Sequence, residues 1–272
     1  MIETIASFDG RIAKVQGPAR SGKTEALVRR CACLVRGGAA PETILVETSS
    51  AAAAQAFRRR LRRAIGPDLQ HAADDVHVRT ALETCVAVLD APAARAATGR
   101  VPRLLNDAEY NFFLEDMKTL GQPIRRLRKM LDFFYRQMSD LEPRDSWLAG
   151  GEEEAVLSHL ERVLASRGAM LAQEAPSLCA AYLRSDAGEG VRGSYAYVLC
   201  DDFQNMSRAE QTCLCLLADR QLIACGNPNQ QQAARASFPC AEGFVQFDAR
   251  RRDVAVFTPV SYTHLTLPTK LE

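Results

Sequence analysis

The hydrophobic positions of this chain follow two spacings, one typical of strands and one typical of helices. Strands are predicted where short apolar or alternating runs occur, at 11–15, 44–48, 76–80, 195–200 and 221–226. Helices are predicted where apolar residues recur three or four positions apart, at 25–36, 51–63 and 82–89 and after the capping box at 207–210. Strands that alternate with helices indicate an α/β fold, in which helices flank a parallel sheet.

The middle of the chain has helical spacing only. One helix is predicted after Asn106, a second after Pro123, and a third stretch over 152–183 that is broken near Gly168. Residues 90–103 are rich in Ala, Pro and Arg and are predicted to be a crossing loop. We therefore expect an all-helical subdomain at 91–185, inserted into an α/β domain made of 1–90 and 186–259. Its core is expected to contain the aromatic residues Tyr110, Phe112, Phe113, Phe133, Phe134 and Tyr135.

One short segment between the first predicted strand and helix fits the phosphate-loop pattern G-x-x-x-x-G-K-[ST]. It consists of Gly17, Pro18, Ala19, Arg20, Ser21, Gly22, Lys23 and Thr24. The backbone N–H groups of such a loop can surround phosphate oxygens, Lys23 adds positive charge, and the Thr24 hydroxyl can bind Mg²⁺. The segment therefore predicts a P-loop nucleotide site for ATP and Mg²⁺. Arg20 stands where many such loops carry glycine.

Polar side chains follow two of the later strands. Asp201 and Asp202 end the apolar run at 195–200, and Gln230 follows the run at 221–226. Ligands bind at the carboxyl ends of parallel strands, where the phosphate loop also lies. We expect Asp201 to hold Mg²⁺, Asp202 to orient or deprotonate the attacking water, and Gln230 to sense the γ-phosphate. The alternative is a pair of solvated aspartates or a helix cap.

Composition restricts the class of protein further. The chain is 47% hydrophobic and 25% charged, which is typical of soluble globular proteins, and its net charge of +1 requires any nucleic-acid contact to be a local patch. No signal peptide or long apolar run is present, so we expect a cytoplasmic protein that does not enter the membrane. The nine cysteines include no C-x-x-C, which favours buried free thiols over disulfides or a metal site.

The last residues do not follow the pattern of the rest. Codons can be chosen for 260–269 that resemble a sequencing-library adapter, so we expect 260–272 to be an artefact and exclude it from the fold. It follows, as an expectation, that the chain is the N-terminal fragment of a longer protein.

The order of these motifs resembles the first RecA-like domain of superfamily 1 DNA helicases of the UvrD/Rep/PcrA and AddA/AddB kind. Residues 48–54 resemble the family's T-F-T-N-x-A-A, residues 78–82 its V-x-T-F-H, residues 198–205 its V-D-E-F-Q-D and residues 226–230 its G-D-P-x-Q. The resemblance covers nearly all of 11–247. It implies a RecA-like ATP-binding domain that contacts single-stranded DNA through Thr48, Ser49, Ser50 and Thr80, with nuclease or helicase subunits as further partners.

Several positions depart from the family pattern, and these departures weaken the expectation of motor activity. The family's second carboxylate is Glu, whereas this chain has Asp202, which retracts the carboxylate by about 1.5 Å. A displacement of that size can cost about 10²-fold in rate. Ser49 and Ala81 replace aromatic residues that stack on bases in the family.

The resemblance implies an ATP-dependent helicase or translocase on single-stranded DNA, poorly active as a fragment. Two alternatives stay open. The first is a degenerate structural subunit of a helicase–nuclease complex that binds nucleotide or DNA without motor activity. The second is a small-molecule kinase whose lid contains Arg125, Arg126 and Arg128.

Overall fold

The computed structural model describes residues 1–148, 150–230 and 238–258, and it contains one parallel sheet. The sheet has six strands in the order β3-β2-β4-β5-β1-β6, which confirms the predicted α/β fold. The strand bounds are β1 Ile12–Gln16, β2 Ile44–Glu47, β3 His77–Arg79, β4 Tyr195–Cys200, β5 Ala218–Gly226 and β6 Val254–Phe257. The edge strand β6 was not predicted from the sequence. The expected adapter-derived segment 260–272 lies outside the described residues.

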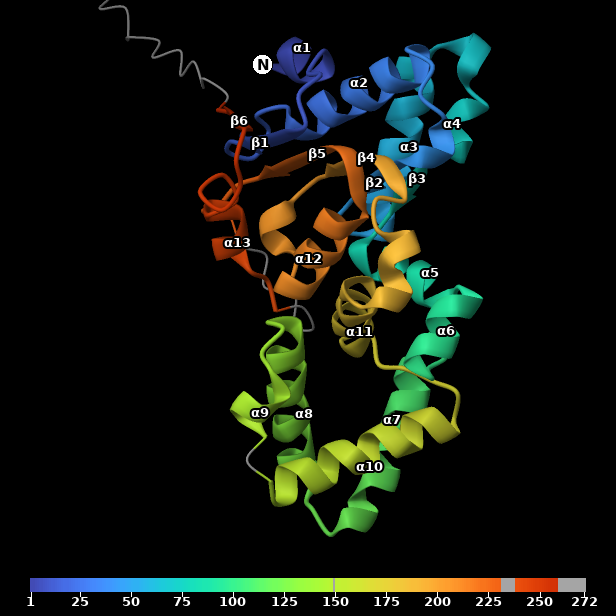
Figure 1. Ribbon diagram of the computed structural model, residues 1–272, viewed down its shortest axis with the longest axis vertical. Coiled ribbons are helices and arrows are strands. Elements are labelled where there is room, and N and C mark those ends of the chain that lie inside the picture. Colours follow the sequence, from blue (N-terminus) through green and yellow to red (C-terminus); the bar gives the residue numbers. More distant parts are fainter. Residues whose placement is uncertain (149, 231–237, 259–272) are drawn as a thin grey trace, which may run out of the picture.

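Helices cover both faces of the sheet (Figure 1). Neighbouring residues of β2 show the two sides, because Val46 packs with α2 and α3 whereas Leu45 packs with α12 and α13. Both faces are therefore buried, which explains why the strand sequences are apolar runs. The helices on these faces are α1 Ile2–Ala6, α2 Lys23–Arg36, α3 Ala51–Ile65, α12 Arg208–Leu217 and α13 Ala241–Val245, with α4 Ala72–Asp75 before β3.

A group of helices extends from the sheet region to the far end of the molecule (Figure 1). We call it the helical arm, and it consists of α7 Asp107–Met117, α8 Ile124–Ser139, α9 Arg144–Trp147 and α10 Glu152–Ser166. Its core is apolar and contains Phe113, Phe134 and Tyr135, as expected. Tyr110 packs against this core as well, but the expectation is wrong for Phe112 and Phe133, which are 70% and 41% exposed.

The predicted crossing loop at 90–103 is also wrong. After α5 Ala81–Asp90, the chain forms α6 Pro92–Thr98. Its local sequence favours a helix, since Pro92 occupies the first position and Gly99 ends the helix with a φ of +64°. Burial of Ala94 fixes the helix against its neighbours.

The break near Gly168 is confirmed, because α10 ends at Ser166 and α11 Glu174–Arg184 follows it. Helix α11 packs against α5 and α12, next to the sheet, rather than within the arm core. The proposed domain boundaries stay predictions. Short 3₁₀ helices complete the chain at η1 Pro41–Thr43, η2 Pro67–Leu69, η3 Lys118–Leu120, η4 Asp186–Val191 and η5 Phe203–Asn205. Among the helices that are described, none is long and apolar enough to cross a membrane.

Candidate nucleotide site

The phosphate-loop segment connects β1 to α2 at the carboxyl edge of the sheet. The Gly17 N–H donates to the Gly226 carbonyl over 3.1 Å, which ties the loop to the end of β5. Gly22 has a φ of +87°, and a Cβ there would lie 3.0 Å from Ile2 Cδ1, so this position requires glycine. Arg20 also has a positive φ, +62°. This explains why glycine is common at that position, and an arginine there costs about 1–2 kcal/mol.

Lys23 lies inside the loop and is 8% exposed. Its ammonium donates to the carbonyl oxygens of Gly17 and Pro18, both over 2.8 Å. The Ser21 hydroxyl is buried and has no hydrogen-bond partner within the described part of the chain. A buried cation and an unpaired hydroxyl in one loop fit an anionic ligand with several oxygens, because such a ligand satisfies both.

Thr24 and Asp201 meet, as the sequence predicted. The Thr24 hydroxyl donates to Asp201 Oδ2 over 2.6 Å, and the Asp201 N–H donates to the Glu47 carbonyl over 2.9 Å, which extends the β2–β4 pairing. Burial raises the pKa of Asp201, while the hydrogen bond from Thr24 and the charge of Lys23 act in the opposite direction. A hydroxyl and a carboxylate at this separation are oxygen ligands of the kind that Mg²⁺ prefers.

Asp202 follows in a left-handed conformation with a φ of +54°, and its N–H donates to Asp201 Oδ1 over 3.2 Å. Aspartate tolerates this conformation better than most residues. The turn separates the two carboxylates, so that Asp201 is buried whereas Asp202 is half-buried. Backbone strain of this kind is common at functional sites.

Gln204 holds the loop after β5 against the end of β4, a role that the sequence analysis missed. It is 2% exposed, its Oε1 accepts from the Asn227 N–H over 3.1 Å, and its Nε2 donates to the Gln230 carbonyl over 3.2 Å. A glutamine just after a strand-end carboxylate pair was the available signal. The Gln230 side chain is exposed, so Gln230 joins the site through its backbone.

A comparison with known families agrees with this geometry. The family model of the UvrD/REP helicase N-terminal domain matches residues 3–231. The chain belongs to this family. The resemblance inferred from the motifs is thereby confirmed, and membership implies an ATP-dependent helicase that binds DNA. No curated protein matches the chain.

The residues that the helicase resemblance assigns to DNA lie at the carboxyl ends of β2 and β3. The Thr48 hydroxyl donates to the carbonyls of Ser50 and Arg79, over 3.2 and 3.3 Å. The Ser50 hydroxyl caps α3, and the Thr80 hydroxyl caps α5 in a reciprocal box with Glu83. Ser49 is exposed. Three of the four hydroxyls therefore have structural partners in this helicase domain.

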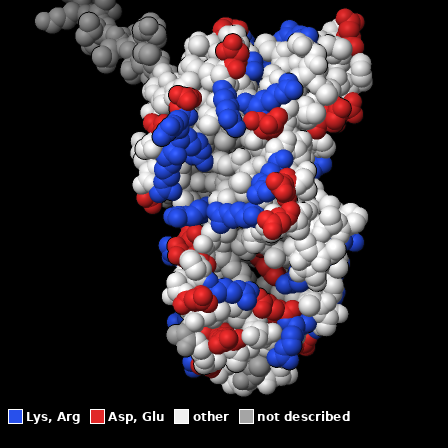
Figure 2. Space-filling view, in the orientation of Figure 1, with Lys and Arg blue, Asp and Glu red and all other residues white. Residues whose placement is uncertain are grey.

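Arginines line hollows on the described part of the surface, and two of these hollows lie beside the sheet region. The first, of about 330 Å³, is lined by Arg58 and Arg79 together with Ala51, Ala54, Gln55 and Glu83, next to the capped helices α3 and α5. The second, of about 250 Å³, has four arginines in its lining, Arg184, Arg208, Arg250 and Arg251. Figure 2 shows Lys and Arg side chains gathered across the middle of one face. These are local patches in a chain of nearly zero net charge, as the sequence analysis required of any nucleic-acid contact.

Glu47, at the end of β2, is a second polar residue that the sequence analysis missed. Its side chain is fully buried, Oε1 accepts from the Thr84 hydroxyl, and Oε2 has no partner in the described part of the chain. Burial raises the pKa of Glu47 well above its usual range. The signal was a carboxylate at the end of an apolar strand, beside the predicted DNA-contacting segment.

Proposed function

We propose that this chain is the ATP-binding part of an ATP-dependent helicase or translocase that acts on single-stranded DNA. The observation that carries the proposal is the contact between Thr24 and Asp201, next to the buried ammonium of Lys23. Lys23 and Thr24 are adjacent, whereas Asp201 comes from a distant segment, and together the three side chains offer a cation and two oxygen ligands.

The nucleotide phosphates would lie on the loop from Gly17 to Thr24. Lys23 would exchange its bonds to the loop carbonyls for bonds to phosphate oxygens, and Ser21 would gain a partner for its buried hydroxyl. Thr24 and Asp201 would hold Mg²⁺, which neutralises phosphate charge when it is bound.

Hydrolysis would depend on Asp202 and Gln230. Asp202 would orient or deprotonate the attacking water. Gln230 would sense the state of the nucleotide, and Gln204 would transmit its position to the Asp201–Asp202 turn, because Gln204 is hydrogen-bonded to the Gln230 carbonyl. Gln204 is thus a positioning residue.

Single-stranded DNA would cross the carboxyl edge of the sheet near Ser49, Ser50, Thr48 and Thr80. Because two of these hydroxyls cap helices and that of Thr48 donates to backbone carbonyls, we assign the phosphate contacts to Arg58 and Arg79 in the adjacent hollow. Their binding would be weakened by salt, as is usual for contacts to the DNA backbone.

The first experiment measures MgATP affinity by isothermal titration with the wild-type chain, Lys23→Ala, and Lys118→Ala as control. Lys118 is an exposed lysine that pairs with Glu115 in the helical arm. We expect Lys23→Ala to weaken binding by about 10²-fold or more, since it removes a charge-assisted contact, and Lys118→Ala to have no effect. Unchanged affinity in Lys23→Ala would show that the nucleotide site is elsewhere.

One competing function is a structural subunit that binds nucleotide without motor activity. The presence of Asp202 in place of the family's Glu favours this function. ATP turnover of the whole protein to which this ATP-binding part is proposed to belong, measured with and without single-stranded DNA, separates the two functions, with Asp202→Ala as the inactive reference. The helicase proposal expects turnover that DNA stimulates and that Asp202→Ala abolishes. Wild-type turnover equal to that of Asp202→Ala would favour the structural subunit.

A further inference from the structure

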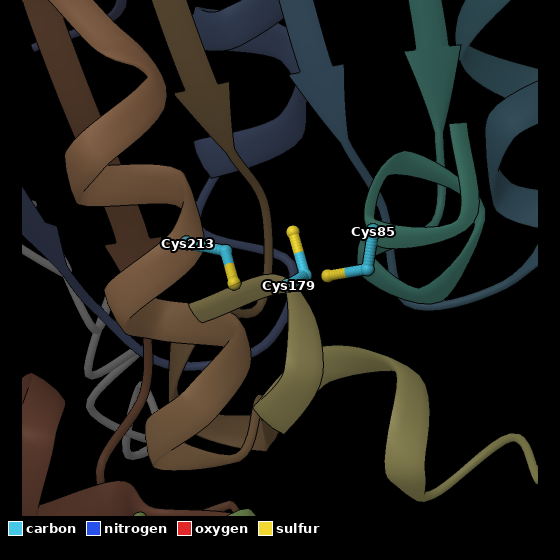
Figure 3. Close-up of side chains that lie close together, drawn as sticks. All are labelled: Cys85, Cys179 and Cys213. Carbon is cyan, nitrogen blue, oxygen red and sulfur yellow. The ribbon is translucent and has the colours of Figure 1, made fainter. Parts of the chain in front are cut away.

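Three cysteines from distant parts of the sequence meet beneath the sheet (Figure 3). Cys85 lies on α5, Cys179 on α11 and Cys213 on α12, and their sulfur atoms all lie within 4.8 Å of one another. Each is at most 1% exposed, and all three belong to one hydrophobic cluster. Figure 3 shows Cys179 between the other two, with the Cys85 sulfur directed toward it.

The remaining buried cysteines provide a contrast. Cys31, Cys200 and Cys225 lie in the sheet region outside this cluster, and burial raises the pKa of Cys31 to about 12, as expected for an isolated thiol in an apolar core. The cluster differs, because its three sulfurs lie together and the Cys213 thiol donates to the Pro176 carbonyl over 3.4 Å. It therefore places three soft ligand atoms at one buried point of the fold.

We propose that Cys85, Cys179 and Cys213 together bind one thiophilic metal ion, either Zn²⁺ or Cu⁺. Soft thiolate ligands select these ions. Zn–S bonds of about 2.3 Å in tetrahedral geometry place the sulfurs about 3.8 Å apart, so the cluster needs to close by about 1 Å at most. In the described part of the chain, no His, Asp or Glu ligand atom joins the three sulfurs. Cu⁺ is satisfied by three thiolates, whereas Zn²⁺ takes a small fourth ligand.

Metal binding also releases protons, because a thiol must be deprotonated before it can act as a ligand. Each thiol that binds the metal becomes a thiolate and gives its proton to solvent, so that affinity rises with pH. No electron is transferred in this step.

The position of the cluster gives the ion a structural role in this fold. Helix α5 begins after Thr80 at the carboxyl end of β3, and α12 follows the turn that contains Asp202. A metal ion shared by α5, α11 and α12 would fix these segments relative to one another. Because it would bind the folded state, it would also raise the melting temperature.

The test uses the chain stripped of metal with a chelator under reducing, anaerobic conditions. Zn²⁺ is added to one sample and acetonitrile-stabilised Cu⁺ to another, and excess ion is removed from both. Elemental mass spectrometry then measures the metal bound per chain. We expect at least one of the two samples to retain one equivalent of metal per chain, and the sample that does so identifies the ion. Less than a tenth of an equivalent in both samples would refute the proposal.

Cys179→Ser and Cys85→Ala should lower retention at least tenfold, whereas Cys31→Ser and Cys225→Ser serve as matched buried controls and should retain the ion. A readout on the wild type avoids dependence on folding of the variants. Bound metal should protect Cys85, Cys179 and Cys213 from alkylation during partial denaturation, as mapped by peptide mass spectrometry. Protection at other cysteines instead would overturn the assignment.

Discussion

The sheet region and the helical arm differ in where they place charged side chains. Near the nucleotide site, Lys23 and Asp201 are 8% and 9% exposed, and Glu47 is fully buried. In the arm, charges pair on the surface, with every partner at least 32% exposed, in Arg126–Glu152, Arg144–Glu161 and Arg167–Asp116. Burying a charge costs several kcal/mol unless partners compensate. The sheet region therefore bears a cost that these arm pairs avoid, both at the proposed site and at Lys14 and Arg30, which are 4% and 8% exposed.

The largest effect is expected when a core residue of the helical arm is removed, and it is a loss of stability. Phe134→Ala removes a fully buried ring that contacts Trp147, and we expect a loss of about 3–5 kcal/mol in the free energy of unfolding. Phe133→Ala is the matched control on the same helix, because that ring is 41% exposed. Urea denaturation measures both. Equal losses would show that the arm does not pack as described.

Asp201→Asn tests a buried residue of the sheet region whose proposed role is chemical and not structural. Asparagine keeps an acceptor for Thr24 but removes the charge, so Mg²⁺-dependent ATP affinity should fall about 10–100-fold. The free energy of unfolding should stay the same or rise, because a buried carboxylate is no longer desolvated. Titration with and without Mg²⁺ measures the first effect. A loss of stability with unchanged affinity would mean that Asp201 is structural.

Glu47→Gln tests whether the buried carboxyl group makes the stability of the fold depend on pH. The pKa of Glu47 is raised in the folded state above its ordinary value of 4.5, so the folded state binds the proton more tightly than the unfolded state. Stability that this group contributes is present below pH 4.5 and is lost as pH rises toward the folded pKa. Glu47→Gln should therefore be more stable than wild type at pH 7–8, and the gap should narrow toward pH 4.5.

The exposed Glu42, just before β2, supplies the control for this pH series. Glu42→Gln should follow the wild-type curve of melting temperature against pH. If Glu47→Gln follows it as well, the carboxyl of Glu47 does not titrate differently on folding.

The smallest effect is expected for the arm's surface pairs. A double-mutant cycle on Arg126 and Glu152, which are 55% and 33% exposed, should give a coupling free energy of about 1 kcal/mol or less. Added salt should reduce it further. A coupling of several kcal/mol would remove the contrast with the sheet region.

Local patterns predicted the elements whose signals are short-range. The alternation in β1, the capping boxes at Asn106 and Ser207, and the glycines of the phosphate loop each act over a few residues. The same reasoning failed at α6, where an Ala-rich segment was expected to be a loop although Pro92 and Gly99 mark the two ends of a helix and Ala94 is buried. It also failed for Phe112 and Phe133, since the side of a helix that becomes the core depends on the neighbouring helices.

The sequence by itself determined the parallel α/β fold and the phosphate-loop segment, and it placed Thr24 and Asp201 at the same edge of the sheet. It could do so because carboxyl ends of parallel strands share one edge and the motif residues lie on that edge. Only the tertiary structure decided the burial of Glu47, the connection from Gln204 to Gln230 and the meeting of Cys85, Cys179 and Cys213. These contacts join segments that no spacing rule relates, because the packing of whole helices and strands, rather than local conformation, brings them together.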